Sequence, residues 1–133
     1  MSIFNLYPPI TELPFLAFDD TYMEQECLTV IVPDEFVLTG SWKAVITCQM
    51  ATSISGNVTF EVVTDKFPTI RGQTNALVPG EGKGLGKIEI SLPNMEVASG
   101  VNYLRFCLAR IAHDLADTAC GDCKVFKIEL QAT

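Results

Sequence analysis

The sequence is poor in charged side chains, and basic residues are the scarcer kind. Its 133 residues contain nine lysines and arginines against sixteen acidic residues, which gives a net charge of −7 at pH 7. A protein that binds duplex nucleic acid needs a basic surface opposite the phosphates, and an anionic membrane surface attracts basic segments for the same reason. We therefore expect neither nucleic acid nor membrane among the partners.

Long apolar stretches and a secretion signal are also missing. No run approaches the roughly 20 apolar residues that cross a bilayer, and residues 1–11 contain no basic residue and no continuous apolar segment, unlike a secretory signal. We therefore expect no signal that directs the chain out of the cytoplasm where it is made. With 48% hydrophobic residues, it has the composition of one folded domain and not that of a disordered chain.

The sequence offers few combinations of residues that could form a catalytic site, because it contains a single histidine. His113 lies near Asp114 and Asp117, but no nucleophile in a Gly-x-Ser-x-Gly elbow completes a triad. The glycines of residues 80–86 lead into an alternating segment and no Ser or Thr follows Lys83, so we interpret them as a hairpin loop and not as a phosphate loop. We predict no enzyme and no cofactor.

The five cysteines do not suggest a disulfide scaffold. Cys27, Cys48 and Cys107 lie in or beside apolar alternating segments, where a thiol behaves as a small hydrophobic side chain. Cys120 and Cys123 have the spacing of half a zinc site, but structural zinc usually takes four ligands. We favour a tight turn between these two cysteines and no metal, and keep a small metal-binding protein as an alternative function.

Apolar and polar residues alternate with a period of two through most of the chain, as in half-buried strands. We expect strands in or near residues 15–18, 27–32, 42–50, 58–63, 74–78, 87–92, 103–110 and 124–130. Short strands at fairly even spacing are typical of an all-β sandwich or barrel. We predict an all-β fold with a single antiparallel β-sandwich, jelly-roll-like, over residues 15–133. An immunoglobulin-like sandwich is the second choice.

Residues 1–14 are predicted to form an extended N-terminal arm. Pro8, Pro9 and Pro14 disfavour a helix. The arm carries apolar side chains that form a candidate interface: Ile3, Phe4, Leu6, Tyr7, Ile10 and Leu13. An arm of this kind packs on its own domain or crosses to a neighbouring subunit, and the sequence leaves both possibilities open.

The connection over residues 111–123 holds the histidine, three aspartates and the Cys-x-x-Cys pair. The spacing of Asp114, Asp117 and Asp122 does not match an EF-hand calcium loop. Aspartates in loops often accept hydrogen bonds from nearby backbone amides. We therefore predict that these three carboxylates act as a scaffold for the loop.

Three segments resemble small β-sandwich virion proteins of tailed bacteriophages. They are Ser55-Gly-Asn-Val-Thr-Phe-Glu-Val62, Tyr103-Leu-Arg-Phe-Cys-Leu-Ala-Arg110 and Asp114-Leu-Ala-Asp-Thr-Ala-Cys-Gly-Asp122. Phe18-Asp-Asp20 and Trp42-Lys-Ala-Val45 are also similar, so the resemblance spans residues 17–130. It implies a structural or attachment role on a virion and no enzymatic activity.

From the fold, the arm and this resemblance we predict a structural virion protein. It would be a capsid decoration or cement protein that stabilises the capsid lattice through its arm and sandwich edges. We expect a homotrimer bound to the major capsid protein or to another virion protein, located in the virion after synthesis in the host cytoplasm. The alternative is a tail-associated or carbohydrate- or receptor-binding β-sandwich module, and the second alternative is a metal-binding protein that uses Cys120 and Cys123.

Overall fold

The computed structural model describes residues 3–7, 16–20, 24–31, 39–64, 71–96 and 103–132. The strands in these ranges are β1 (Ile3–Tyr7), β2 (Leu16–Phe18), β3 (Glu24–Ile31), β4 (Thr39–Met50), β5 (Gly56–Thr64), β6 (Arg71–Val78), β7 (Gly86–Glu96), β8 (Tyr103–Arg110) and β9 (Cys123–Ala132). The described part contains no helix, and so none that is long and apolar enough to cross a membrane. The prediction of an all-β fold is confirmed.

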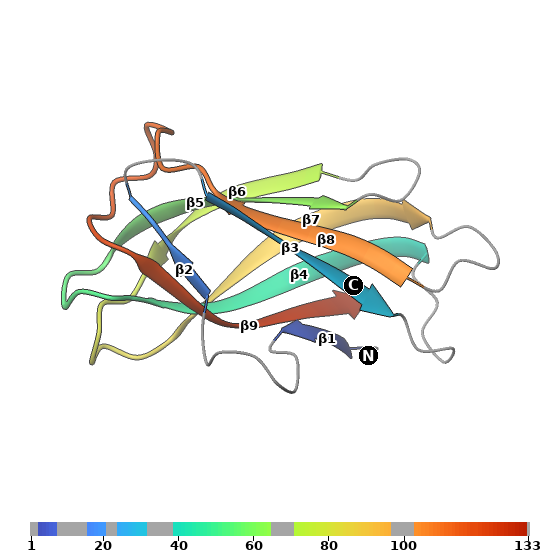
Figure 1. Ribbon diagram of the computed structural model, residues 1–133, viewed down its shortest axis with the longest axis horizontal. Helices are drawn as coiled ribbons and strands as arrows, with labels where there is room; N and C mark the ends of the chain where they lie inside the picture. The colour runs from blue at the N-terminus through green and yellow to red at the C-terminus, as the bar shows by residue number, and fades with distance from the viewer. Residues whose placement is uncertain are drawn as a thin grey trace.

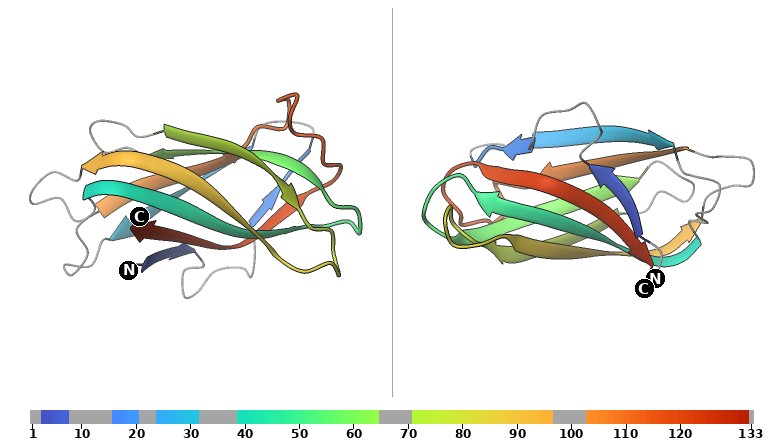
Figure 2. Two further views of the ribbon diagram at one scale, coloured as in Figure 1. Left: turned by 180° about the vertical axis from the view of Figure 1, so that it is seen from behind. Right: turned by 90° about the horizontal axis from the view of Figure 1, so that it is seen from below.

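The strands form two antiparallel sheets (Figure 1). Sheet A has the order β1-β9-β4-β7, and β2 also pairs with β9; sheet B has the order β3-β8-β5-β6. Figure 2 shows from two further sides that β3 and β8 lie in the layer opposite β4 and β7. Strands that follow one another in sequence are thus distributed over both sheets in the order of a jelly roll. The predicted jelly-roll-like sandwich is confirmed, and the observed order differs from that of an immunoglobulin domain.

The hydrophobic core lies between the sheets and is built from alternate positions of the central strands. On β4, which lies over the segment predicted as a strand at 42–50, the alternate apolar residues Trp42, Ala44, Ile46, Cys48 and Met50 are all buried. The facing strands contribute Phe60, Phe106 and Leu108, among others. Each fully buried aliphatic or aromatic side chain of this kind stabilises the fold by roughly 1.5–3 kcal/mol. The period-two pattern therefore identifies the core face correctly.

The first two strands lie end to end along one edge of β9. β1 pairs with residues 128–131 of β9, and β2 pairs with residues 123–125. The backbone of the first part of the predicted arm is thus a strand in sheet A of its own domain. Of the candidate interface residues, Ile10 and Leu13 lie outside the described residues, as does the predicted boundary at residue 14. The other four, Ile3, Phe4, Leu6 and Tyr7, belong to β1, and their contact with another subunit stays a prediction.

Candidate functional site

Three connections close one end of the sandwich, at the left of Figure 1. They span residues 51–55, 79–85 and 111–122. Backbone hydrogen bonds join them: Ala51 N–H donates to the carbonyl of Asp122 at 2.9 Å, and Glu81 N–H donates to that of Thr52 at 2.7 Å. Backbone bonds between separate loops leave each loop little freedom, so this end of the molecule is a preformed surface.

A buried arginine at the end of β8 holds the 111–122 loop. The Arg110 guanidinium donates to both carboxylate oxygens of Asp117, from Nε at 3.0 Å and from Nη2 at 2.8 Å. It also donates to the main-chain carbonyls of Phe18, Ala119 and Gly121, at 3.1, 2.9 and 2.7 Å. All five N–H donors of the arginine therefore have acceptors, and none is left for a substrate.

The electrostatics of this cluster are those of a structural ion pair. Both side chains are at most 1% exposed. Burial by itself would lower the pKa of Arg110, but the hydrogen bond with Asp117 and its negative charge outweigh this effect and raise the pKa above its ordinary value. Loss of one partner from such a pair leaves the other charge buried without compensation, which typically costs about 3–5 kcal/mol.

The three aspartates of the loop make different hydrogen bonds. Asp117 Oδ2 also accepts a hydrogen bond from the backbone N–H of Thr59 at 3.0 Å, so it joins the loop to β5. Asp114 Oδ1 accepts one from the N–H of Ala116 at 2.8 Å, which closes a local turn. Asp122 contributes its main-chain carbonyl, and its side chain is exposed.

The remaining residues singled out in this loop do not converge. His113 and Cys120 are exposed, whereas Cys123 is fully buried beside Cys48. The hydrogen bond with the Cys48 thiol and the burial of the site raise the pKa of the Cys123 thiol. A thiol with a raised pKa is a poor nucleophile and metal ligand, since both roles need the thiolate. Within the described ranges, no three His, Cys, Asp or Glu side chains are placed to hold a metal ion.

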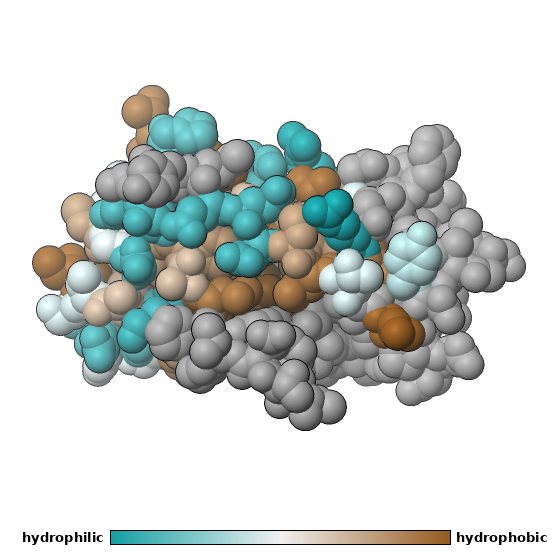
Figure 3. All heavy atoms as spheres, in the orientation of Figure 1, coloured by the Kyte–Doolittle hydropathy of each residue, from teal (hydrophilic) through white to brown (hydrophobic). Residues whose placement is uncertain are grey.

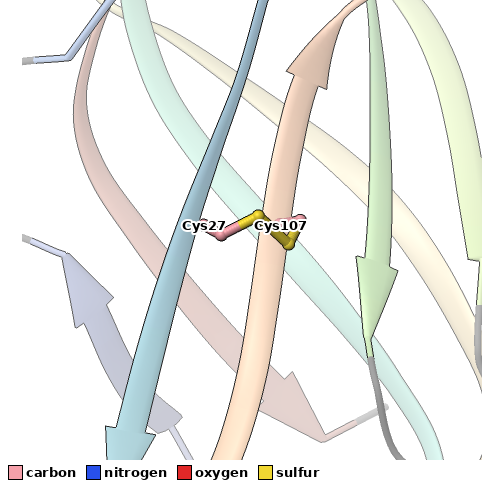
Figure 4. The surroundings of a disulfide bond; sticks show 2 residues. All are labelled: Cys27 and Cys107. Carbon is pink, nitrogen blue, oxygen red and sulfur yellow. A yellow bond between two sulfur atoms is a disulfide. The ribbon is translucent and has the colours of Figure 1, made fainter.

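Cys27 and Cys107 are joined by a disulfide, which corrects the expectation that both are small hydrophobic thiols. They lie directly opposite each other on β3 and β8 (Figure 4). The physical reason is their orientation: Cys107 alternates with buried Phe106 and therefore lies on the outer face of sheet B. The two cysteines are 80 positions apart in sequence, so their pairing becomes apparent only from the strand register.

The outer face of sheet B, called here the sheet B face, is the second candidate site. Apart from the disulfide, it includes Gln25, Thr29 and Ile31 of β3, Tyr103, Arg105 and Ala109 of β8, Thr59, Glu61 and Val63 of β5, and Arg71, Gln73 and Asn75 of β6. Figure 3 shows hydrophilic side chains beside apolar ones on the side of the molecule turned to the viewer. The face thus combines amides, hydroxyls, guanidinium groups and one exposed aromatic ring.

The strand register arranges these side chains in rows across the sheet. One row runs Gln25, Ala109, Glu61 and Gln73, from β3 to β6. Ala109 is only 2% exposed although it lies on an outer face, because longer side chains stand on either side of it. The row therefore exposes the polar side chains of Gln25 and Gln73, while Ala109 lies beneath its longer neighbours.

The next row begins with the disulfide and continues with Val63 and Arg71. The Arg71 guanidinium lies 3.9 Å from the carboxylate of Glu61. At that distance, and with the arginine largely exposed, the ion pair is weak. The exposed Arg71 guanidinium can therefore reorient toward a ligand at small cost.

The outer face of sheet A differs because its charges are neutralised internally. Lys43 donates to Glu89 at 2.9 Å across β4 and β7, and Lys127 lies 3.6 Å from Glu129 on β9. Val45, between these ion pairs, is only 4% exposed. The long charged side chains cover the apolar centre of this face.

Comparisons with known proteins show a similarity of fold and none of sequence. No known protein family and no curated protein match the sequence. Among solved structures, an arabinose-bound α-L-arabinofuranosidase, MgGH51, matches with a TM-score of 0.53 and 14% identity over 98% of this chain. The chain corresponds to 22% of the length of that enzyme. A family 11 carbohydrate-binding module from Clostridium thermocellum, in complex with a β-1,3-1,4-mixed-linked tetrasaccharide, matches with a TM-score of 0.50 and 11% identity over 98% of this chain and 96% of its own.

Several residues of these sites are not identified as functional or structural from the sequence alone. Arg110 has the alternation parity of the buried β8 residues, a signal that it needs an acidic partner inside the molecule. Asp20, whose Oδ2 accepts a hydrogen bond from Gly121 N–H at 2.6 Å, lies 101 residues from that partner, and no local pattern connects them. The comparisons and the geometry together show one antiparallel β-sandwich of the jelly-roll type.

Proposed function

We propose that this β-sandwich is a non-catalytic binding module that holds carbohydrate on the sheet B face. The observation that carries the proposal is the row of Gln25, Glu61 and Gln73 around the small side chain of Ala109. Amide and carboxylate groups have the donors and acceptors that pairs of sugar hydroxyls require. The amides of Gln25 and Gln73 are exposed and therefore accessible to a sugar.

The rest of the face has matching chemistry. Tyr103 is 49% exposed and offers an aromatic ring with a polar hydroxyl. This combination suits a ligand that has one apolar side and one polar, hydrated side. Arg105 and Thr29 face each other across β8 and β3 in the row beyond the disulfide. A flat, polar face of this kind binds an extended chain of sugars better than a single small molecule.

A further support is that one structural neighbour is a carbohydrate-binding module solved with a mixed-linked tetrasaccharide. Its fold covers nearly the whole of both chains. At 11% identity this neighbour does not specify which residues bind or which sugar is bound, so the choice of the sheet B face comes from the residues of this chain alone.

Affinity electrophoresis against a panel of soluble polysaccharides tests the proposal, with β-1,3-1,4-mixed-linked glucan and an arabinose-containing polysaccharide among the probes. We expect at least one polysaccharide to retard the protein. Gln73→Ala and Tyr103→Ala should weaken that retardation several-fold, and Lys87→Ala on the outer face of sheet A should not. A folded protein that no polysaccharide retards, or equal retardation of all variants, would contradict the proposal.

We propose as a second candidate the structural role on a virion, in which the protein decorates a capsid as a trimer. The observation that favours it is the loop end, where Ile54, Leu85 and Leu115 are 68%, 59% and 98% exposed. Figure 3 shows apolar residues at this end of the molecule. Exposed aliphatic side chains on fixed loops are typical of protein contacts, and on a repeating lattice several weak contacts act together.

Sedimentation velocity of the full chain and of a variant without residues 1–13 tests the assembly role. We expect a trimer for the full chain and a smaller folded species after the deletion. Leu115→Ser should leave the trimer intact but reduce attachment to a capsid lattice, if the loop end is the lattice contact. A monomeric full chain would contradict the trimer, and an unchanged sedimentation profile after the deletion would remove the arm from the assembly.

A further inference from the structure

The disulfide fastens an edge strand that the hydrophobic core holds weakly. β3 is the first strand of sheet B, and within the described residues it pairs only with β8. Leu28 is the one described β3 side chain that packs against the core, while Glu24 and Glu26 occupy the other described inward positions. The neighbouring β8 buries three large hydrophobic side chains in the core. Among the described side chains, burial therefore stabilises β3 less than it stabilises β8.

The two glutamates explain why this strand needs another attachment. A carboxylate gains nothing from an apolar interior and stays at its margin; Glu24 there accepts a hydrogen bond from the N–H of Asp19 at 2.8 Å. Among the described contacts of β3, what remains is the packing of Leu28 and the backbone ladder with β8. A ladder at a sheet edge opens locally more readily than one in the sheet centre.

We propose that the Cys27–Cys107 disulfide is a redox-controlled pin for β3, and that its reduction releases β3 and weakens carbohydrate binding on the sheet B face. The part about carbohydrate rests on the function proposed above. β3 contributes Gln25, Thr29 and Ile31 to that face, so its release removes the side chains along one whole edge. A chain made in a reducing compartment then completes its binding face only in oxidising surroundings, where disulfides persist.

The chemistry is thiol–disulfide exchange with a dithiol as the reductant. One thiolate of dithiothreitol attacks a sulfur of the bond, and its second thiol closes the cyclic disulfide and expels the remaining cysteine. Two electrons and two protons pass from the reagent, and Cys27 and Cys107 end as thiols. Cys27 is only half-buried on the outer face, so the reagent can reach the bond, whereas Cys48 and Cys123 lie inside the core.

Hydrogen exchange measured by mass spectrometry, on the full chain with and without dithiothreitol, tests the pin directly. In the reduced protein we expect exchange of the amides of residues 24–31 to accelerate at least tenfold more than that of the amides of β4 and β9, which serve as the internal reference. The variant Cys27→Ser with Cys107→Ser should reproduce the fast exchange without reductant, and Cys120→Ser should not. Unchanged protection of β3 overturns the pin, and so does an equal acceleration of exchange in β3, β4 and β9, because the bond would then hold the whole domain and not β3 in particular.

Polysaccharide affinity of the same oxidised and reduced samples tests the control of binding. We expect reduction to weaken the affinity at least tenfold and reoxidation to restore it. Equal affinity in both states, with β3 released, overturns redox control while leaving the pin in place. If the oxidised protein binds no polysaccharide, the proposed function fails, and the exchange experiment still decides whether the disulfide pins β3.

Discussion

The 111–122 loop and the edge strand β3 are both peripheral to the core, but they are attached by different means. Arg110 and Asp117 fix the loop through a buried, fully satisfied hydrogen-bond network. β3 is fixed by its backbone ladder and by the bond between Cys27 and Cys107. A network of charges responds to loss of a single partner, whereas a disulfide responds to the redox state of the surroundings. The attachment of the 111–122 loop is therefore independent of the redox conditions, whereas the attachment of β3 can change with them.

This contrast also separates the two candidate binding surfaces. The loop end, with its exposed aliphatic side chains, includes the loop that the buried Arg110–Asp117 network holds. The sheet B face includes β3 and therefore depends on the Cys27–Cys107 disulfide. A partner bound at the loop end should remain bound under reducing conditions, and a ligand on the sheet B face should not.

The largest expected effect comes from Arg110→Ala. It leaves the Asp117 carboxylate buried without its partner. It also removes the hydrogen-bond donors of three main-chain carbonyls. We expect the free energy of unfolding to fall by about 3–5 kcal/mol, as measured by urea denaturation. The control is Arg71→Ala, which removes a largely exposed arginine and should cost less than about 1 kcal/mol. Similar losses for the two variants would contradict the structural role of the network.

Removal of the disulfide should have the next largest effect. Cys27→Ser with Cys107→Ser opens a cross-link between residues 80 apart in sequence, and loss of such a bond typically costs roughly 2–4 kcal/mol. Cys120→Ser, which changes an exposed free thiol, should leave the midpoint of urea unfolding unchanged. If the double variant were as stable as the wild type, the ladder and Leu28 would suffice to hold β3.

A smaller effect is expected from Asp114→Ala within the loop. The substitution removes the hydrogen bond to the N–H of Ala116 but leaves the Arg110 network in place, so we expect a loss of about 1 kcal/mol. His113→Ala, next to it and exposed, is the matched control and should be close to neutral. A loss for Asp114→Ala as large as that for Arg110→Ala would show that the turn, and not the buried network, fixes the loop.

The smallest perturbation is labelling of thiols in the folded, oxidised protein. We expect iodoacetamide to modify Cys120 quickly and to leave Cys48 and Cys123 unmodified, because the latter two are buried and the raised pKa of Cys123 keeps its thiol protonated. Peptide mapping by mass spectrometry locates the label. Rapid modification of Cys123 would contradict the buried thiol pair.

The fold could be predicted from the sequence because it depends on local alternation. Every second residue of segments such as 42–50 is apolar, and this pattern alone identifies the face that packs in the core. The candidate sites could not be predicted in the same way, because they depend on strand order. Cys27 meets Cys107, and Gln25 shares a row with Gln73, only through a register that joins distant segments.

The central claim, that the sheet B face binds carbohydrate, is tested most directly by mapping amide chemical shifts. Two-dimensional NMR spectra of the oxidised protein, titrated with an oligosaccharide of a retarding polysaccharide, report the residues at which the ligand binds. We predict shift changes on β3, β8, β5 and β6, centred on the row of Gln25, Ala109, Glu61 and Gln73, and none at the loop end. Shift changes confined to residues 51–55, 79–85 and 111–122, or to the outer face of sheet A, would contradict the claim.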